Sequence, residues 1–152
     1  MTRTNKTALI TGASSGLGME LARLHAQNGD DLVLVARSKE KMLQLEAEVI
    51  KKYDTTITII AKDLSLPPAP EEVYEEVKAK GIEVEYLINN AGFGGRGTFA
   101  ERPMAQEMMM IQVDIVALTK LTKLFLPEMV SQVGLSMPYR ILWFLFFLLF
   151  HN

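Results

Sequence analysis

The sequence predicts an α/β protein built on a doubly wound parallel sheet. Short apolar or β-branched runs alternate with amphipathic segments along the chain, as strands and helices do in such folds. The run over residues 32–36 is continuously apolar, which is typical of a strand buried on both faces. A glycine-rich turn over residues 11–18 joins the first run to the first helical segment. With 152 residues, the chain has the size of one domain.

The first unit is expected to be a strand over residues 7–10, the turn, and a helix over residues 19–28. Glycines let a backbone turn tightly, approach a phosphate closely and pack a helix against its strand, and those in this turn are Gly12, Gly16 and Gly18. The N-terminus of the helix adds unpaired N–H groups and a partial positive charge. The turn is therefore a candidate site for the phosphates of a dinucleotide.

The second and third strands are expected over residues 31–36 and 55–61. The helix between them would begin after Ser38, whose side chain can cap it. Apolar residues at helical spacing predict its buried face, formed by Met42, Leu45 and Val49.

Residues 67–70, Pro-Pro-Ala-Pro, are expected to form a loop that cannot be helical. A short helix follows over residues 71–80, and Gly81 ends it. The fourth strand is expected over residues 84–88 and leads into Asn-Asn-Ala-Gly at residues 89–92.

A flexible loop over residues 93–97 and a long helix over about residues 103–129 come next. The helix has a broad apolar face, which indicates burial over much of its circumference. We expect this face to contain Ile111, Ile115, Leu118 and Phe125, widened by Val113, Ala117, Leu121 and Leu124.

Two motifs carry a family resemblance. The turn has the spacing Gly-x-x-x-Gly-x-Gly, and the fourth strand is followed by Asn-Asn-Ala-Gly. With both motifs in order, each at the end of a strand, residues 6–130 resemble the short-chain dehydrogenase/reductase family. The resemblance implies a Rossmann-like fold that binds a nicotinamide dinucleotide. The residues expected to bind it are Thr11, Gly12, Ser14, Ser15, Gly16, Leu17, Gly18, Arg37, Asp63, Leu64, Asn90, Ala91 and Gly92.

The cofactor preference is inferred from the residue after the second strand. Enzymes that prefer NAD place a carboxylate there, which binds the ribose 2′-hydroxyl. Here Arg37 follows the strand and no acid occurs before Glu40. A guanidinium can bind a 2′-phosphate bidentately, so we predict NADP(H) in preference to NAD(H). The alternative is a solvated arginine at the start of a helix, and Lys39 and Lys41 are interpreted as surface charges.

The resemblance implies further roles for three residues. Asp63 would accept a hydrogen bond from the adenine amino group, or would cap a helix. Asn89 would stabilise the sheet. Asp114 lies where the family has a catalytic asparagine, and it keeps an acceptor but lacks the amide donor. The alternative for Asp114 is a helix residue with a local partner.

The serine and the Tyr-x-x-x-Lys pair that transfer protons in the family are not found. Tyr139 is followed four residues later by Trp143. Tyr74 and Lys78 have the spacing but lie between the third and fourth strands, so we interpret them as a surface pair. His25 is expected in ordinary packing or on the surface, not as a base.

Composition excludes several other functions. The net charge is −2 with both signs interspersed, which gives no electrostatic case for nucleic-acid binding. The chain has no cysteine and two histidines, without metal-ligand spacing, so we expect no disulfide and no metal. Residues 1–6 are polar, and the apolar run after them is too short for a signal peptide. We therefore expect a cytoplasmic location.

We divide the chain into a partial NAD(P)-binding domain, residues 1–132, and a divergent apolar tail, residues 133–152. Residues 141–150 are all apolar. They can be interpreted as a fifth strand, as half of a membrane span, or as sequence never selected for this fold, as after a frameshift or premature stop. The abrupt change in composition favours the third interpretation. The fold would then be truncated after about the fourth or fifth strand, and its open sheet edge and tail could support self-association.

The leading hypothesis is an NADP(H)-dependent oxidoreductase of carbonyl or alcohol substrates by lineage, inactive as this truncated chain. One alternative is a non-catalytic dinucleotide-binding fragment that associates with intact relatives. Another is a poorly folding product of an interrupted gene.

Overall fold

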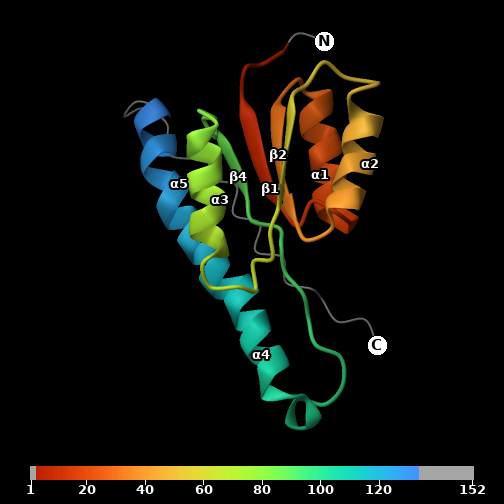
Figure 1. Ribbon diagram of the computed structural model, residues 1–152, viewed down its shortest axis with the longest axis vertical. Helices are drawn as coiled ribbons and strands as arrows, with labels where there is room; N and C mark the ends of the chain where they lie inside the picture. Colours follow the sequence, from red (N-terminus) through yellow and green to blue (C-terminus); the bar gives the residue numbers. More distant parts are fainter. Residues whose placement is uncertain (1–2, 134–152) are drawn as a thin grey trace.

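A computed structural model of the chain describes residues 3–133. At its centre is a parallel sheet of four strands in the order β3-β2-β1-β4 (Figure 1). The strands are β1 (Thr7–Thr11), β2 (Asp31–Ala36), β3 (Ile57–Ala61) and β4 (Tyr86–Ile88). The chain extends the sheet from β1 to β3 on one side and then crosses to place β4 on the other side of β1. The strand order therefore reverses between β1 and β4, which confirms the predicted α/β class.

Helices cover both faces of this sheet. In Figure 1, α1 and α2 cover one face, while α3 and α5 cover the other. Their bounds are Gly16–Gln27 for α1, Lys39–Val49 for α2, Ala69–Ala79 for α3 and Leu118–Val133 for α5. A separate buried cluster lies under each layer, one including Ile10, Leu34 and Met42 and the other including Leu9, Val33 and Phe125. Alternate residues along β1 and β2 thus enter opposite clusters, as the period of two in a strand requires.

The α2 helix matches its predicted buried face but not its predicted cap. Met42, Leu45 and Val49 are all buried. Ser38 is at the N-cap position, yet its side chain makes no capping hydrogen bond and donates instead to Glu40 Oε2 at 3.4 Å. The predicted cap is therefore wrong, because a neighbouring carboxylate takes the hydroxyl.

The start of α3 also differs from the prediction. The helix begins at Ala69 and includes Pro70, which we expected in a loop. Proline fits the first turn of a helix, where its missing N–H would have no intrahelical partner. The end of α3 agrees with the sequence, since Gly81 follows it with φ of +66°.

The predicted long helix is present, and it is interrupted by a wider turn. It consists of α4 (Met104–Ile111), the π-helical segment η2 (Gln112–Ala117) and α5, and the short 3₁₀ turn η1 (Phe99–Glu101) precedes it. The expected apolar face is partly wrong. Ile111 and Ile115 are 42% and 58% exposed. The buried apolar residues in the described part of this helix are Val113, Ala117, Leu121, Phe125 and Met129.

Two features explain the exposed isoleucines. The π-helical turn changes the phase of the residues before it, so a stripe drawn at α-helical spacing does not continue through it. In addition, α4 projects beyond the sheet (Figure 1), where fewer core residues are available to cover it.

Several predictions concern residues that the structure does not describe. Apart from Val133 in α5, the apolar tail lies outside the described residues. Its three interpretations therefore stay predictions. Within residues 3–133, β4 is an edge strand, as the sequence suggests. None of the helices in this part of the chain combines the length and hydropathy that a membrane span requires.

Candidate functional site

A cleft of about 470 Å³ lies at the carboxyl ends of the strands. Residues that follow each of the four strands line it. In open α/β sheets, ligands bind in the crevice at this end, where the strand order reverses. The lining residues are Gly12, Ser14, Ser15, Gly16, Leu17, Val35, Ala36, Arg37, Lys62, Asp63, Leu64, Ser65, Asn90, Ala91, Gly92, Phe93, Met109 and Val113.

The floor of the cleft is formed where the ends of β1 and β4 are tied together. Thr11 Oγ1 accepts the backbone N–H groups of Asn90 at 3.0 Å and Ala91 at 2.9 Å. The side-chain amide of Asn90 donates to the carbonyl oxygens of Thr11 at 3.0 Å and Gly12 at 3.4 Å. The motif that follows β4 thus holds the start of the glycine-rich turn in place.

At two positions of the turn, neighbouring atoms of the protein lie so close to the backbone that only glycine fits. Gly12 has φ of +68°, and a Cβ there would lie 2.8 Å from Asn90 Nδ2 and 2.9 Å from Ala91 Cα. A Cβ at Gly18 would lie 2.4 Å from the Gly12 carbonyl oxygen. These contacts leave no space for a side chain, so the turn passes close to both β4 and α1.

The N-terminus of α1 opens into the cleft. The helix begins at Gly16, and Ser15 at its N-cap makes no side-chain capping hydrogen bond. The first N–H groups of a helix have no intrahelical partner, and they carry a partial positive charge. Together with Ser14 and Ser15, they can bind an anionic group such as a phosphate.

Arg37 supplies an unpaired cation at one side of the cleft. The lining includes two cations, and Lys62 is paired with Glu72 at 2.6 Å. Arg37 is exposed, directly follows β2 and has no hydrogen-bond or ion-pair partner within residues 3–133. Its guanidinium is therefore available to a ligand.

Asp63 follows β3 on the same side of the cleft. Its Oδ1 accepts the Ser65 backbone N–H at 3.0 Å, and Leu64 between them is buried. This local turn leaves Oδ2 of Asp63 as a further acceptor, with Leu64 as an apolar surface beside it. Such a pair can contact a flat, partly polar ring.

The opposite end of the cleft is more apolar. Gly92 and Phe93 from the segment after β4 face Met109 and Val113 of the long helix. Asp114 does not line the cleft but its Oδ1 accepts the Phe93 backbone N–H at 3.2 Å. Burial raises the pKa of Asp114, and the hydrogen bond from Phe93 opposes this shift. The residue as a whole is exposed, while its Oδ1 lies against the backbone of Gly92 and Phe93.

The structure brings nearly all the residues predicted to bind the cofactor into one cleft. Thr11 and Gly18 are the exceptions, since both are buried behind its wall. Sequence reasoning missed several lining residues: Val35, Ala36, Lys62, Ser65, Phe93, Met109 and Val113. For Met109 and Val113, on the long helix, the only sequence signal is that they form an apolar pair at i, i+4 spacing. This signal is weak, because whether the pair reaches the cleft depends on how the helix crosses the sheet.

Tyr74 and Lys78 lie outside the cleft, in agreement with the predicted surface pair, but they share a partner that the sequence did not reveal. The Tyr74 hydroxyl donates to Glu128 Oε1 at 3.0 Å, and Lys78 Nζ donates to Glu128 Oε2 at 2.8 Å. The hydrogen bond to Glu128 raises the pKa of Tyr74. The two side chains therefore join α3 to α5, and neither lines the cleft.

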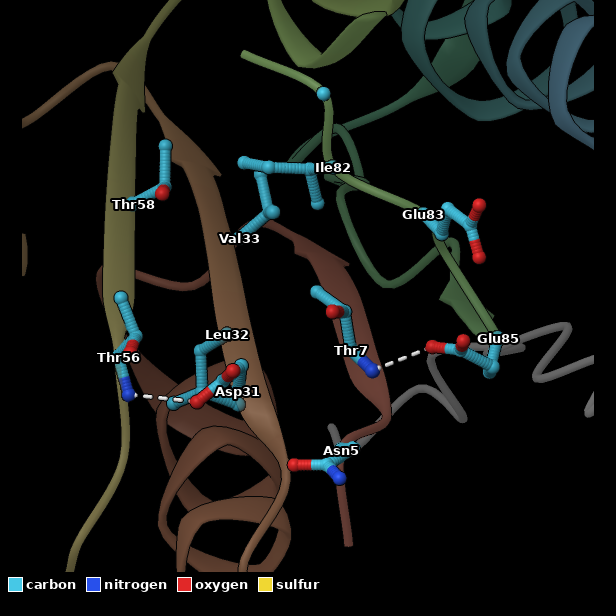
Figure 2. A pocket seen from close by; sticks show the side chains of 11 residues that line it. Asn5, Thr7, Asp31, Leu32, Val33, Thr56, Thr58, Ile82, Glu83 and Glu85 are labelled. Carbon is cyan, nitrogen blue, oxygen red and sulfur yellow. Dashed lines mark hydrogen bonds between the residues drawn. The ribbon is translucent and has the colours of Figure 1, made fainter. Parts of the chain in front are cut away.

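A second cavity, of about 320 Å³, lies at the amino ends of the strands (Figure 2). Its lining includes Asp31, Glu83 and Glu85. Two of these acids accept backbone N–H groups, Asp31 from Thr56 at 2.7 Å and Glu85 from Thr7 at 2.5 Å. Arg3 pairs with Asp31, but no cation of the described chain lines this cavity, whereas an unpaired arginine and a helix N-terminus lie at the cleft, so the cleft is the candidate site for phosphates. Within residues 3–133, no group of three or more His, Asp or Glu could hold a metal ion.

The strand order and the cleft at its reversal define a Rossmann-type α/β domain. The chain belongs to the short chain dehydrogenase family, whose family model matches residues 6–135. It is 32% identical over 131 residues to the very-long-chain 3-oxoacyl-CoA reductase of Homo sapiens, a match that covers 82% of this chain and 41% of that protein.

Solved structures of the same kind are also similar. The L-sorbose reductase of Gluconobacter frateurii, complexed with NADPH and L-sorbose, matches with a TM-score of 0.79 and 28% identity, over 87% of this chain and 50% of that one. A short-chain dehydrogenase of Sphingobium yanoikuyae in complex with NADPH matches with a TM-score of 0.78 and 33% identity, over 84% and 49%. The chain thus spans about two fifths of the curated relative and about half of the solved structures.

Proposed function

We propose that this chain binds NADP(H), in preference to NAD(H), as the nucleotide-binding part of an oxidoreductase of carbonyl or alcohol substrates. The cleft fits the group: residues 14–17 of the glycine-rich turn line it, and the N-terminus of α1 can bind the charge of a pyrophosphate. Similar structures are complexed with NADPH. When bound, the nicotinamide ring supplies or accepts hydride.

The observation that carries the preference for NADP(H) is the position of Arg37. Its guanidinium is exposed at the cleft directly after β2 and has no partner within residues 3–133. The nearest acid in sequence, Glu40, is turned to the Ser38 hydroxyl at 3.4 Å. A 2′-phosphate would therefore meet an unpaired, bidentate donor and no neighbouring carboxylate directed at it.

Other residues of the cleft would hold the rest of the nucleotide. We expect Asp63 and Leu64 to contact the adenine ring, and the backbone at Gly92 to approach a ribose. Asn90 holds this arrangement by binding the carbonyl oxygens of Thr11 and Gly12.

The test is a pair of titrations with the purified chain, using NADPH and NADH. We expect Arg37→Ala to weaken NADPH binding by about 10- to 100-fold, the loss expected for a hydrogen-bonded charge pair, and to leave NADH unchanged. Arg37→Asp should favour NADH, because a carboxylate can accept from the 2′-hydroxyl. Lys39→Ala removes the same charge two residues away and should change neither affinity. Equal affinities of the wild-type chain for NADH and NADPH would contradict the proposal.

We further propose that residues 3–133 contribute nucleotide binding but not proton transfer. The one Tyr-x-x-x-Lys pair in this part of the chain, Tyr74 and Lys78, is bound to Glu128 outside the cleft. Its tyrosine has a raised pKa, the opposite of what a proton-donating tyrosine activated by lysine requires. Saturable NADPH binding without reduction of a panel of ketones would support this proposal, and measurable turnover by the 152-residue chain would contradict it.

A further inference from the structure

A carboxylate on the long helix meets the backbone that lines the apolar end of the cleft. Asp114 Oδ1 accepts the Phe93 N–H at 3.2 Å, across 21 residues of sequence. A Cβ added to Gly92 would lie 3.2 Å from the same oxygen and 3.6 Å from Cγ of Asp114. The carboxyl group is therefore packed directly on the peptide between Gly92 and Phe93.

The segment after β4 has few other supports. Thr11 holds the N–H of Ala91, but within residues 3–133 the backbone from Phe93 to Gly97 forms no hydrogen bond except the one to Asp114. Further along, the Arg102 guanidinium packs on Gly95, so closely that a Cβ there would overlap it. The bond to Asp114 is thus the polar contact that sets where this segment leaves the cleft.

The helix is locally widened where Asp114 lies. Asp114 belongs to the π-helical segment η2, and its neighbour Val113 lines the cleft. Single π-helical turns inside α-helices occur frequently at functional sites. Here the widened turn places Val113 in the lining of the cleft and the Asp114 carboxylate against the backbone of Gly92 and Phe93.

We propose that Asp114 is a positioning residue, which holds the Gly92–Phe93 wall of the cleft in the conformation that admits a ligand. It acts through the backbone of Phe93 and not by contact with the ligand. The structural part of this inference is independent of which ligand binds, and only its final measurement rests on the proposed function.

Hydrogen exchange in the unliganded chain tests the contact. Asp114→Ala removes the acceptor, so the Phe93 amide should exchange about tenfold faster or more, as expected when a hydrogen bond to a charged group is lost. Asp114→Asn keeps an acceptor and should restore most of the protection. Thr119→Ala, an exposed position on the same helix, should leave the Phe93 amide unchanged. Equal exchange in wild type and Asp114→Ala would overturn the proposal.

A double-mutant cycle tests the packing. Gly92→Ala brings a methyl group against the Asp114 carboxylate, so it should destabilise the wild-type chain more than the Asp114→Ala chain. We expect the increase in the unfolding equilibrium constant to differ by about threefold or more between the two backgrounds. Equal increases in both backgrounds would show that the two residues are not in contact.

Nucleotide titration then separates positioning from direct binding. We expect Asp114→Ala to weaken NADPH binding about fivefold and Asp114→Asn to restore it, in parallel with the exchange data. Weaker binding with unchanged exchange at Phe93 would show direct contact with the nucleotide and contradict the positioning role. If the wild-type chain does not bind NADPH at all, the proposed function fails, while the exchange and cycle results still decide the role of Asp114.

Discussion

Two hydrogen bonds join Thr11 to Asn90, and Asn90 is the donor in both. The Asn90 backbone N–H donates to Thr11 Oγ1, and the Asn90 side-chain amide donates to the Thr11 carbonyl oxygen, both at 3.0 Å. These two bonds tie the carboxyl ends of β1 and β4, the strands between which the sheet order reverses. The glycine-rich turn and the segment after β4 therefore meet at a single buried point, and the cleft opens above it.

Removing the Thr11 hydroxyl should destabilise the fold. Thr11→Val keeps the shape of the side chain but leaves the Ala91 N–H without its acceptor and the Asn90 N–H with the Ile88 carbonyl oxygen alone. Since Thr11 is 1% exposed, water cannot replace it, and we expect a loss of about 2–3 kcal/mol in the free energy of unfolding. Urea denaturation measures this loss. Thr58→Val, in β3, is the control, because within residues 3–133 the Thr58 hydroxyl has no hydrogen bond; a loss of similar size there would contradict the interpretation.

Gly18→Ala should disrupt both the turn and nucleotide binding. The added methyl group would lie 2.4 Å from the Gly12 carbonyl oxygen and 2.5 Å from Asn90 Nδ2, and the first of these is backbone that can move only by distorting the turn. We expect a lower melting temperature and little NADPH binding in a fluorescence titration. Gly94→Ala is the matched control, since a Cβ there meets nothing within 4 Å. Normal binding by Gly18→Ala would mean that the close approach of α1 to the turn is not required.

Acid should weaken the contact between α1 and α2. Arg23 Nη2 lies 2.8 Å from Glu48 Oε2, and hydrogen bonds from Arg23 and then Lys52 lower the pKa of Glu48 to about 2. A carboxyl whose pKa is lowered by folding contributes stability above its unfolded pKa of 4.5, and this contribution is lost as the pH falls toward 2. Glu48→Gln should therefore flatten the dependence of stability on pH between about 4.5 and 2. Glu75→Gln, at an exposed position on α3, should leave that dependence as it is in the wild type.

Truncating Phe125 should have the largest effect on the face formed by α3 and α5. Its ring is 1% exposed and lies edge-on to Tyr74, with centroids 5.1 Å apart. Phe125→Ala removes this packing and leaves a cavity, so we expect a loss of about 3–5 kcal/mol in the free energy of unfolding. Chemical denaturation is the measurement, and Leu24→Ala, at a residue 52% exposed, should cost far less. Comparable losses in the two variants would contradict the assigned core.

Features that depend on local sequence were predicted well. Residues 31–36 form β2 as expected, because the continuous apolar run over residues 32–36 is suited to a buried parallel strand. Gly81 ends α3, because only a residue tolerant of positive φ fits there. The glycine-rich turn lies between β1 and α1 for the same kind of reason.

Features that depend on competition between neighbours were not predicted. Ser38 could cap α2, but Glu40 takes its hydroxyl. Tyr74 and Lys78 were interpreted as a surface pair, and their shared partner was missed, since Glu128 is distant in sequence and only the packing of α3 on α5 brings it close. Ile115 follows an α-helical stripe, but a π-helical turn alters that stripe and leaves the residue exposed.

By itself, the sequence determined the α/β class, the order of the elements and the positions of the two motifs, because each depends on residues a few positions apart. Only the tertiary structure decided that Thr11 binds Asn90, that Met109 and Val113 line the cleft, and that Asp114 meets Phe93. Those contacts depend on where the sheet brings its strand ends and on how the long helix crosses them. They join residues 20 or more positions apart, or elements whose relative placement is set by burial of the whole core, so no local pattern could reveal them.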